Sequence, residues 1–364
     1  MKRMLAFVLA AVLALGMLTG CGSTTDLEAG SKSSAGSSSE GGEAALKVGV
    51  VFTTGGLGDN NFNDMVYAGL NAAKEDMGIT FDYAEPSSGD EYTTMTYDFA
   101  QDGSYDLIIV LSSDGATAVE QVAPEYPDQL FTIVDQEVVG DNICSIVKNG
   151  AEQTFLTGVI AGLLTQDSSY EYANADKKVG AVLGMDVATV VAMAAGFACG
   201  AKFYDPSVEV LVSTVGDFSD VNTAKEMSLS MYEQGVDVIM NLDGSGTGIW
   251  AALEEKQFYG VGCGSNQNTL SPYIVATAGF VLSQIIYDQC KDMIDGTWVS
   301  GTVNPTIRDG AFDYLTDDAS VQLSDEIIKK VEAARDWYET NSDVVLATTM
   351  DTVDAWVAEN GQAA

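Results

Sequence analysis

Residues 53–63, Thr-Thr-Gly-Gly-Leu-Gly-Asp-Asn-Asn-Phe-Asn, combine glycines with several side chains that can bind a small molecule. Glycine lets the backbone approach a ligand closely, and the ring of Phe62 offers a flat apolar face. Asp59, Asn61 and Asn63 supply hydrogen-bond donors and acceptors. The alternative is a structural role, in which Asn61 caps a helix and Phe62 packs in the core. The density of polar side chains favours a ligand-binding site.

A second glycine-rich segment, residues 241–248, reads Asn-Leu-Asp-Gly-Ser-Gly-Thr-Gly. Its glycines are spaced G-x-G-x-G, whereas the dinucleotide-binding fingerprint is G-x-G-x-x-G with an acidic residue about 20 positions later. We therefore expect Asp243, Gly244 and Gly246 to face a small ligand, partly through backbone N–H groups at the start of a helix. A tight turn without a ligand is the alternative.

Other candidate side chains follow predicted strands and offer hydrogen bonds, without a nucleophile and base at a recognisable spacing. They are Thr53, Ser112, Ser113, Asp135, Met185, Ser265 and Asn266. Histidine, the commonest general base, is absent from the sequence. We therefore expect binding rather than catalysis, and no cofactor; an exported enzyme that uses carboxylates is the alternative. No G-x-x-x-x-G-K-[ST] motif occurs, so any transport energy must come from another subunit.

The cysteines and acidic residues do not predict a metal site. Cys144, Cys199, Cys263 and Cys290 are scattered without a C-x-x-C pair. No spaced Asp/Asn loop of the calcium-binding type occurs either. Each of the four cysteines lies among apolar residues or glycines, which favours buried thiols over disulfides.

The chain is strongly acidic, with 53 Asp and Glu against 16 Lys and Arg and a formal net charge of −37. Nucleic acid and anionic lipid surfaces both attract clustered basic residues. We therefore exclude nucleic acid as a partner and attribute the acidity to the solubility of an exported surface.

The N-terminus has the order of an export signal, which we predict over residues 1–20. Lys2 and Arg3 precede an apolar run at residues 4–18. This run is shorter than the roughly 20 apolar residues that a membrane-spanning helix requires.

Residues 18–21, Leu-Thr-Gly-Cys, resemble the lipobox of bacterial lipoproteins. The resemblance implies cleavage before Cys21, acylation of its thiol and a lipid anchor on the outer face of the cell membrane. An ordinary cleaved signal followed by a free cysteine is the alternative. Residues 21–45 are rich in Ser and Gly and are expected to form a flexible linker, because they contain too few apolar residues for a core.

The rest of the sequence alternates short apolar runs with amphipathic stretches, a pattern typical of parallel sheets with crossover helices. Strands are predicted at residues 47–52, 106–111, 130–134, 178–183, 208–214, 236–241 and 260–263. Helices are predicted to begin near Asn63, Gly115, Gln153, Thr189, Thr223, Gly248 and Ser271. The last of these is expected over residues 272–294, before a strand at 303–307 and a closing helix capped by Ser324.

An internal repeat divides these elements into two groups. Residues 47–51, Lys-Val-Gly-Val-Val, are matched 131 positions later by Lys-Val-Gly-Ala-Val at 178–182. At the same offset, Asp-Leu-Ile-Ile at 106–109 is matched by Asp-Val-Ile-Met at 237–240. Two strand pairs that share one offset predict two similar lobes.

We therefore predict an α/β fold of two lobes, of the type I periplasmic-binding-protein kind, in which each lobe is a parallel sheet flanked by helices. Hinge crossings would connect the lobes. The first lobe is expected to comprise residues 46–150 and about 272–305, and the second residues 151–271 and about 306–364. Ligands of open parallel sheets bind at the carboxyl ends of the strands, so the candidate residues would line one cleft.

The motifs in combination resemble the basic membrane protein family, whose members are substrate-binding lipoproteins of ABC importers similar to purine nucleoside receptors. The resemblance spans about residues 47–294 and rests on Gly55-Gly56, Asp59, Phe62-Asn63, Gly69, residues 158–162, Gly196-Phe197, Gly200, Gly216-Asp217-Phe218, Asp220, residues 235–248 and Ser265-Asn266-Gln267. It implies a nucleoside clamped between the lobes, with Phe62 stacking on the base beside Asn63. It also implies an ABC permease and ATPase as partners.

The chain departs from that family pattern at several positions. Thr53 and Gly264 stand where the family commonly carries Asp, and Asn266 replaces a further Asp. Ala276 takes the place of an expected Lys, and Met193 that of an expected aromatic residue in the site. These changes alter which ligand groups can be paired, so another small polar molecule with a flat ring is an alternative to a purine nucleoside. A sensory binding protein that does not transport its ligand has the same sequence pattern.

Overall fold

The computed structural model describes residues 46–362. The predicted signal peptide, Cys21 and the predicted linker lie outside the described residues. The described residues belong to one compact unit. Within the described part of the chain, no helix combines the length and apolarity needed to cross a membrane.

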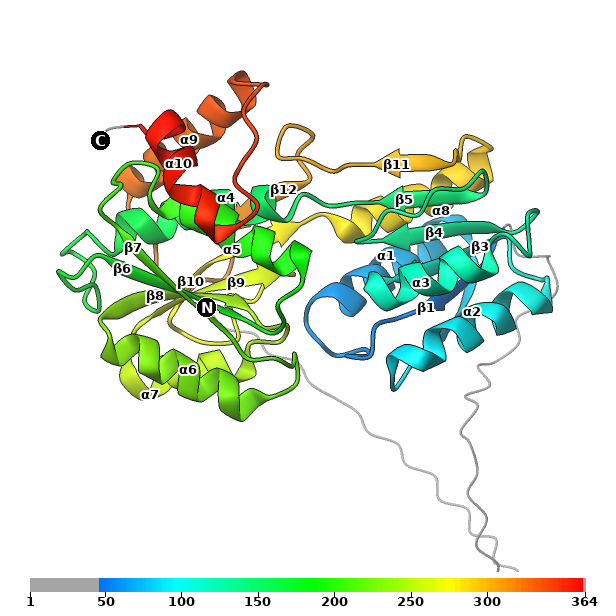
Figure 1. Cartoon of the computed structure of the whole chain (residues 1–364), viewed down its shortest axis with the longest axis horizontal. Helices are drawn as coiled ribbons and strands as arrows, with labels where there is room; N and C mark the ends of the chain where they lie inside the picture. The colour runs from blue at the N-terminus through cyan, green and yellow to red at the C-terminus, as the bar shows by residue number, and fades with distance from the viewer. Residues whose placement is uncertain (1–45, 363–364) are drawn as a thin grey trace, which may run out of the picture. The chain divides into compact units, whose positions relative to one another are not determined.

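The first sheet is wholly parallel and contains β1 to β5 and β11, in the order β11-β5-β4-β3-β1-β2 (Figure 1). The strands are β1 Lys47–Val51, β2 Thr80–Ala84, β3 Leu107–Leu111, β4 Leu130–Val134, β5 Ile143–Ile146 and β11 Gly301–Val303. The central strand β3 is buried along its whole length, whereas the edge strand β2 is largely exposed. Buried central strands of this kind require helices on both faces of the sheet.

The second sheet repeats this arrangement in the order β12-β10-β9-β8-β6-β7. Its strands are β6 Lys178–Leu183, β7 Glu209–Thr214, β8 Val236–Leu242, β9 Tyr259–Gly264, β10 Ile274–Phe280 and β12 Phe312–Leu315. All neighbours are parallel except β12, which pairs antiparallel with β10.

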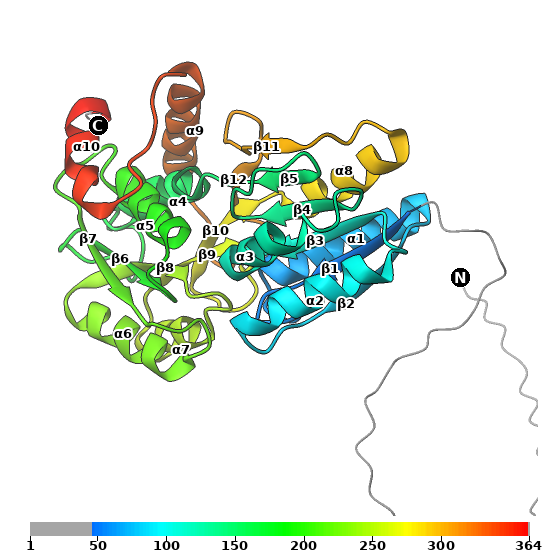
Figure 2. The same ribbon diagram turned by 45° about the vertical axis from the view of Figure 1, so that its right-hand side comes forward.

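Helices cover both faces of each sheet (Figures 1 and 2). They are α1 Phe62–Met77, α2 Gly89–Asp102, α3 Ser112–Val122, α4 Gly150–Leu164, α5 Ala188–Ala201, α6 Val221–Glu233, α7 Thr247–Lys256, α8 Leu282–Asp295, α9 Asp325–Thr340 and α10 Val353–Asn360. On the first sheet, α2 and α3 share a core on one face while α1 and α8 pack on the other. On the second sheet, α6 and α7 lie opposite α4 and α5.

The internal repeat predicted from the sequence is confirmed by the two strand orders. The first copy of each repeated motif lies on β1 and β3, which are neighbours in the first sheet. The second copies lie on β6 and β8, which are neighbours in the second sheet. The two sheets thus place equivalent strands in equivalent positions, and the predicted α/β fold with two parallel-dominated sheets is confirmed.

The helix predicted over residues 272–294 is wrong in its first part, because residues Ile274–Phe280 form the buried strand β10. The run Ile-Val-Ala-Thr-Ala-Gly-Phe is apolar except for Thr277 and adjoins the amphipathic helix α8, so periodicity alone did not separate the two elements. Since β10 pairs with β9, these residues belong to the second sheet and not to the first lobe as expected. The predicted strand at 303–307 is also displaced, because β11 ends at Val303.

The chain passes between the two sheets three times. The crossings lie at residues 147–149 between β5 and α4, at Val281 between β10 and α8, and at residues 304–311 between β11 and β12. A hinge between domains consists of a few loop or element-terminal residues, and these connections are positions of that kind.

Helices α4 and α5 lie in unusually close contact because glycines face one another across them. A Cβ atom at Gly158 would lie 2.1 Å from the carbonyl oxygen of Phe197, and one at Gly196 would lie 2.0 Å from that of Ala151. Gly162 and Gly200 meet the opposite backbone equally closely. The glycines in these parts of the family motif therefore serve helix packing.

Two local predictions are confirmed. The side chain of Ser324 accepts a hydrogen bond from the backbone N–H of Ile327 at 3.3 Å and caps α9. The four cysteines of the described residues are buried free thiols, namely Cys144, Cys199, Cys263 and Cys290.

Candidate ligand-binding site

The loops at the carboxyl ends of the two sheets touch one another. The side chain of Asn61, after β1, donates to the carbonyl of Gly244, after β8, at 3.5 Å. The carbonyl of Asn60 accepts from the Ser265 hydroxyl and from Gln267 Nε2, both after β9. The segments that carry many of the predicted site residues are therefore brought together.

Asn63 and Asp59 organise the loop after β1. Asn63 is fully buried; its Oδ1 accepts from the backbone N–H of Thr53 at 2.9 Å, and its Nδ2 lies 2.7 Å from Thr53 Oγ1 and 2.8 Å from the Gly56 carbonyl. The Asp59 carboxylate caps α1 by accepting from the N–H groups of Asn61 and Asn63. Burial raises the pKa of Asp59, although these backbone hydrogen bonds oppose the shift. Thr53, Asp59 and Asn63 thus use much of their hydrogen-bonding capacity within the loop.

Asn61 occupies the space that a side chain at position 264 would need. A Cβ atom at Gly264 would lie 1.8 Å from Asn61 Oδ1. Gly264 also has φ +93°, which disfavours any other residue. The glycine found where the family pattern carries an acid therefore makes room for the amide of Asn61.

Asp243, at the end of β8, is a buried carboxylate without a full set of partners. Its side chain is 3% exposed, and Oδ1 has no hydrogen-bond partner among the described residues. Burial, followed by repulsion from Asp217 and Asp220, raises the pKa of Asp243 to about 7. A buried acceptor of this kind can take a hydrogen bond from a ligand hydroxyl.

Phe218 lies beside Asp243 and was missed as a site residue in the sequence. A Cβ atom at Gly184 would lie 2.1 Å from Phe218 Cδ1 and 2.9 Å from Asp243 Oδ1, so the ring and the carboxylate share one small volume. The ring is 44% exposed. The sequence motif Gly216-Asp217-Phe218 could have indicated this residue, but the motif was used only as part of the resemblance to the family.

Asp135 forms an ion pair with Lys148, a second residue that was not predicted. The Lys148 ammonium lies 3.3 Å from Asp135 Oδ2, and the two side chains are 11% and 17% exposed. The same ammonium lies 5.3 Å from the ring centroid of Phe62 and 5.8 Å from that of Phe280. The half-buried Phe62, at the start of α1, therefore borders a charged pair from the first sheet and a ring from the second.

Of the other predicted residues, Ser112 and Ser113 begin α3 after β3. The Ser112 hydroxyl lies 3.3 Å from that of Tyr92, and Ser113 is exposed. Met185, after β6, is 40% exposed and is free to contact a ligand.

Three further predicted residues are accounted for by the local structure around them. Met193 is 5% exposed and packs against Gly150 within the α4–α5 contact. Gly246 precedes α7 with a left-handed backbone. Asn266 is exposed, and its side chain donates to the carbonyl of Asp317 at 3.1 Å.

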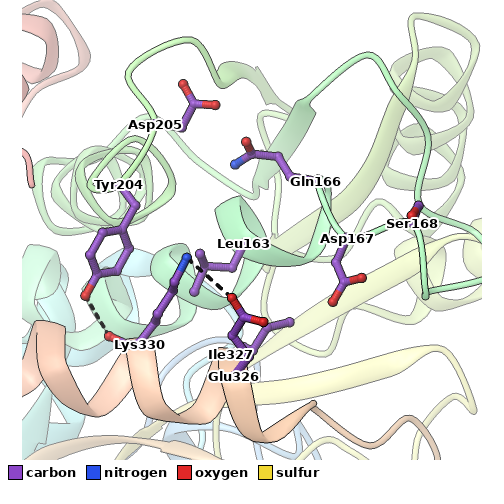
Figure 3. Close-up of a pocket in the computed structure, with 9 residues that line it drawn as sticks. All are labelled: Leu163, Gln166, Asp167, Ser168, Tyr204, Asp205, Glu326, Ile327 and Lys330. Atoms are coloured by element: carbon purple, nitrogen blue, oxygen red, sulfur yellow. Dashed lines mark hydrogen bonds and ion pairs between the residues drawn. The ribbon is translucent and has the colours of Figure 1, made fainter. Parts of the chain in front are cut away.

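A surface pocket of about 380 Å³ lies elsewhere, between the C-terminal end of α4 and α9 (Figure 3). Within it the Lys330 ammonium faces Glu326 at 3.8 Å, and the Tyr204 hydroxyl donates to the Lys330 carbonyl at 2.9 Å. The site loops adjoin the opposite end of α4, about 20 Å away along a helix of this length. Across residues 46–362, no group of three or more Cys, Asp or Glu side chains is arranged to hold a metal ion.

Comparison with known proteins places the chain among transport proteins. Residues 46–347 match the model of the Bmp family, described as ABC transporter substrate-binding protein, PnrA-like. The chain is 25% identical over 354 residues to the "ABC transporter nucleoside-binding protein BmpA" of Lactococcus lactis subsp. cremoris, covering 90% of this chain and 95% of the relative. It is 27% identical over 321 residues to an uncharacterized lipoprotein of Pyrococcus abyssi, covering 80% and 78%.

Among solved structures, an ABC transporter solute-binding protein of Aeropyrum pernix K1 is similar with a TM-score of 0.68 and 25% identity. The match covers 86% of this chain and 85% of that one. The likeness confirms a solute-binding-protein fold of the periplasmic type.

Proposed function

The chain belongs to the Bmp family of PnrA-like ABC transporter substrate-binding proteins, and from this premise we propose that it captures a nucleoside at the loops where the two sheets meet. The ligand would be delivered to an ABC permease whose energy comes from a separate ATPase subunit. The similarity to the nucleoside-binding protein of Lactococcus supports a nucleoside as the ligand. The lipoprotein relative supports an anchor at Cys21 on the outer face of the membrane.

The observation that carries the proposal is the unpartnered Oδ1 of Asp243 beside the exposed ring of Phe218. A buried acceptor without a partner costs about 1 to 3 kcal/mol, and a ligand hydroxyl removes that cost. A flat heterocycle can stack on the neighbouring aromatic ring. A nucleoside supplies both groups, since its ribose carries hydroxyls and its base is flat.

Phe62 provides a second aromatic surface for the same ligand. The side chain is half-buried, and the loop that carries it is fixed by Asn63 and Asp59. A rigid loop stacks a base at a low entropic cost, because the ring does not need to be ordered on binding.

The proposal is tested by identifying the small molecule that the protein carries. We expect full-length protein purified from its native membrane to release a nucleoside on denaturation, detected by mass spectrometry of the supernatant. Protein with the substitution Asp243→Ala, purified in parallel, should release less of it. Release of a sugar or an amino acid in place of a nucleoside would overturn the proposal.

A further inference from the structure

We propose that Lys148 is a specificity-determining residue of this site, and that its ammonium acts together with Asp135 Oδ1 to bind the polar edge of a neutral heterocycle. The inference rests on the proposed function and names the class of base. A heterocycle with adjacent N–H and C=O groups, as in 6-oxopurines and uracil, complements this donor and acceptor pair.

The fold fixes the position of the pair. Asp135 follows β4 and Lys148 follows β5, and these strands pair in parallel with Val134 opposite Ile146. Both side chains therefore leave the same end of the sheet from neighbouring strands. Their separation of 3.3 Å and low exposure show that the ammonium is held in place.

The pair has hydrogen-bonding capacity to spare. Oδ2 of Asp135 faces the ammonium, but Oδ1 is buried without a partner among the described residues. The Lys148 ammonium carries three N–H donors, and an ion pair with one carboxylate oxygen does not use all of them. A donor and an acceptor are therefore available side by side, and their charges balance, which favours a neutral ligand over a cationic one.

The aromatic rings place this pair beside the stacking surface. Distances of 5.3 Å and 5.8 Å from the ammonium to the centroids of Phe62 and Phe280 lie near the outer limit of about 6 Å for cation–π contact. The ammonium therefore lies over both rings at a distance where each cation–π contact is weak. A base that contacts the Phe62 ring would have its polar edge close to Lys148 and Asp135.

The test is a calorimetric titration of the full-length protein in detergent with inosine, uridine, 1-methylinosine and 3-methyluridine. We expect the unaltered protein to bind inosine or uridine roughly tenfold more tightly than its N-methylated form, because methylation removes the N–H that faces Asp135. Lys148→Met should weaken binding of the unmethylated nucleoside by roughly tenfold, whereas Lys148→Arg should retain most of the affinity. Lys202→Met is the matched control, since Lys202 is a similarly buried lysine paired with Asp354 on the second sheet's helices.

Circular dichroism checks the fold of each variant. If Lys148→Met leaves Asp135 unpaired and the protein unfolds, the double substitution Lys148→Met with Asp135→Asn replaces it, with the same expected loss. Unchanged affinity in a folded variant, while the unaltered protein binds inosine or uridine, overturns the role of Lys148 and leaves the proposed function standing. Failure of the unaltered protein to bind any of the four nucleosides, while it binds adenosine or cytidine, overturns the class of base named here and leaves the proposed function standing; failure to bind any nucleoside overturns both.

Discussion

Asp243 carries a cost in the unliganded protein that a ligand would relieve. The carboxyl is buried, and its pKa is raised from an ordinary value near 4 to about 7. At neutral pH the group is therefore close to half ionised and has an oxygen without a partner. A hydroxyl that donates to this oxygen favours the ionised form, so ligand affinity should rise between pH 6 and pH 8.

The raised pKa predicts a pH-dependent effect of Asp243→Asn on stability. Between pH 4 and pH 7 the folded protein binds the Asp243 proton more tightly than the unfolded chain does, so this group's contribution to the free energy of unfolding falls as pH rises. We expect the Asn variant to equal the unaltered protein below pH 4 and to be more stable at pH 8, by a few kcal/mol at most. Urea titrations of the unliganded proteins at both pH values measure the difference. A variant that is less stable at pH 8 would contradict the assignment.

Phe62 is predicted to act on binding more than on folding. The ring is half-buried, and stacking on a base is worth about 1 to 3 kcal/mol, so Phe62→Ala should weaken nucleoside binding by roughly tenfold. A fully buried core Phe would instead cost about 3 to 5 kcal/mol of stability. Calorimetry and thermal melting of the same variant separate these outcomes. Phe155→Ala, at a fully buried ring, is the control that should show the large loss of stability.

The sequence allowed Asp243 and Phe62 to be predicted as site residues because each follows an apolar strand in a glycine-rich loop. Lys148 could not be found in this way, because it follows the short strand β5, which was itself not predicted. The role proposed for Lys148 rests on its ion pair with Asp135, and this ion pair depends on the pairing of β4 with β5. Phe218 lies in a loop whose neighbour Gly184 is distant in sequence.

At the scale of elements, helices α4 and α5 pack with their backbones in direct contact. Both helices are largely buried, and glycines let their backbones approach so closely that an added Cβ atom would overlap the opposite backbone. Close backbone contact increases the number of van der Waals contacts between the helices and leaves little tolerance for added volume.

We predict that Gly196→Ala destabilises the protein although alanine favours helix formation. The added Cβ would lie 2.0 Å from the carbonyl oxygen of Ala151, so the helices must separate. Overpacking of this kind costs about 1 to 3 kcal/mol. Gly89→Ala, at the start of α2, is the control, since its nearest neighbour is the flexible Asp114 carboxyl at 3.3 Å. Equal stability of the two variants in denaturant titrations would show that the α4–α5 contact can relax.

The predicted strands agree with the structure for most continuous apolar runs, and β10 is the exception because it adjoins the amphipathic helix α8. β3, β4, β6 and β8 are buried along nearly their whole length, and the sequence placed each within about a residue or two of its bounds. The edge strand β2 alternates without a clear apolar face and was missed. Helix α2 was missed as well, because its sequence is rich in Thr, Tyr and Asp.

At the scale of the whole molecule, the two sheets are joined by short crossings and by direct contacts of their site loops. Asn60 and Asn61, from the first sheet, contact Ser265 and Gly244, from the second. We propose that the halves move about the crossings to admit a ligand and that these loop contacts stabilise the closed form.

The N-terminal motif predicts a lipid-anchored protein. Cleavage before Cys21 and acylation of its thiol should give a mature chain that partitions into detergent and carries a fatty-acid adduct on its first residue. Mass spectrometry of the N-terminal peptide measures both. Cys21→Ser should release the protein into the soluble fraction or leave it unprocessed, and an unmodified mature N-terminus at another residue would refute the anchor.

The central claim is that this protein binds a ribonucleoside at Asp243 and Phe218. The most direct measurement is calorimetric titration of the full-length protein with adenosine, guanosine, inosine, uridine and cytidine, with ribose and galactose as controls. We expect at least one nucleoside to bind with one-to-one stoichiometry and a Kd on the order of micromolar or tighter. Phe218→Ala and Asp243→Ala should each weaken that binding by roughly tenfold or more. Saturable binding of a control sugar, with no heat from any nucleoside, would contradict the account.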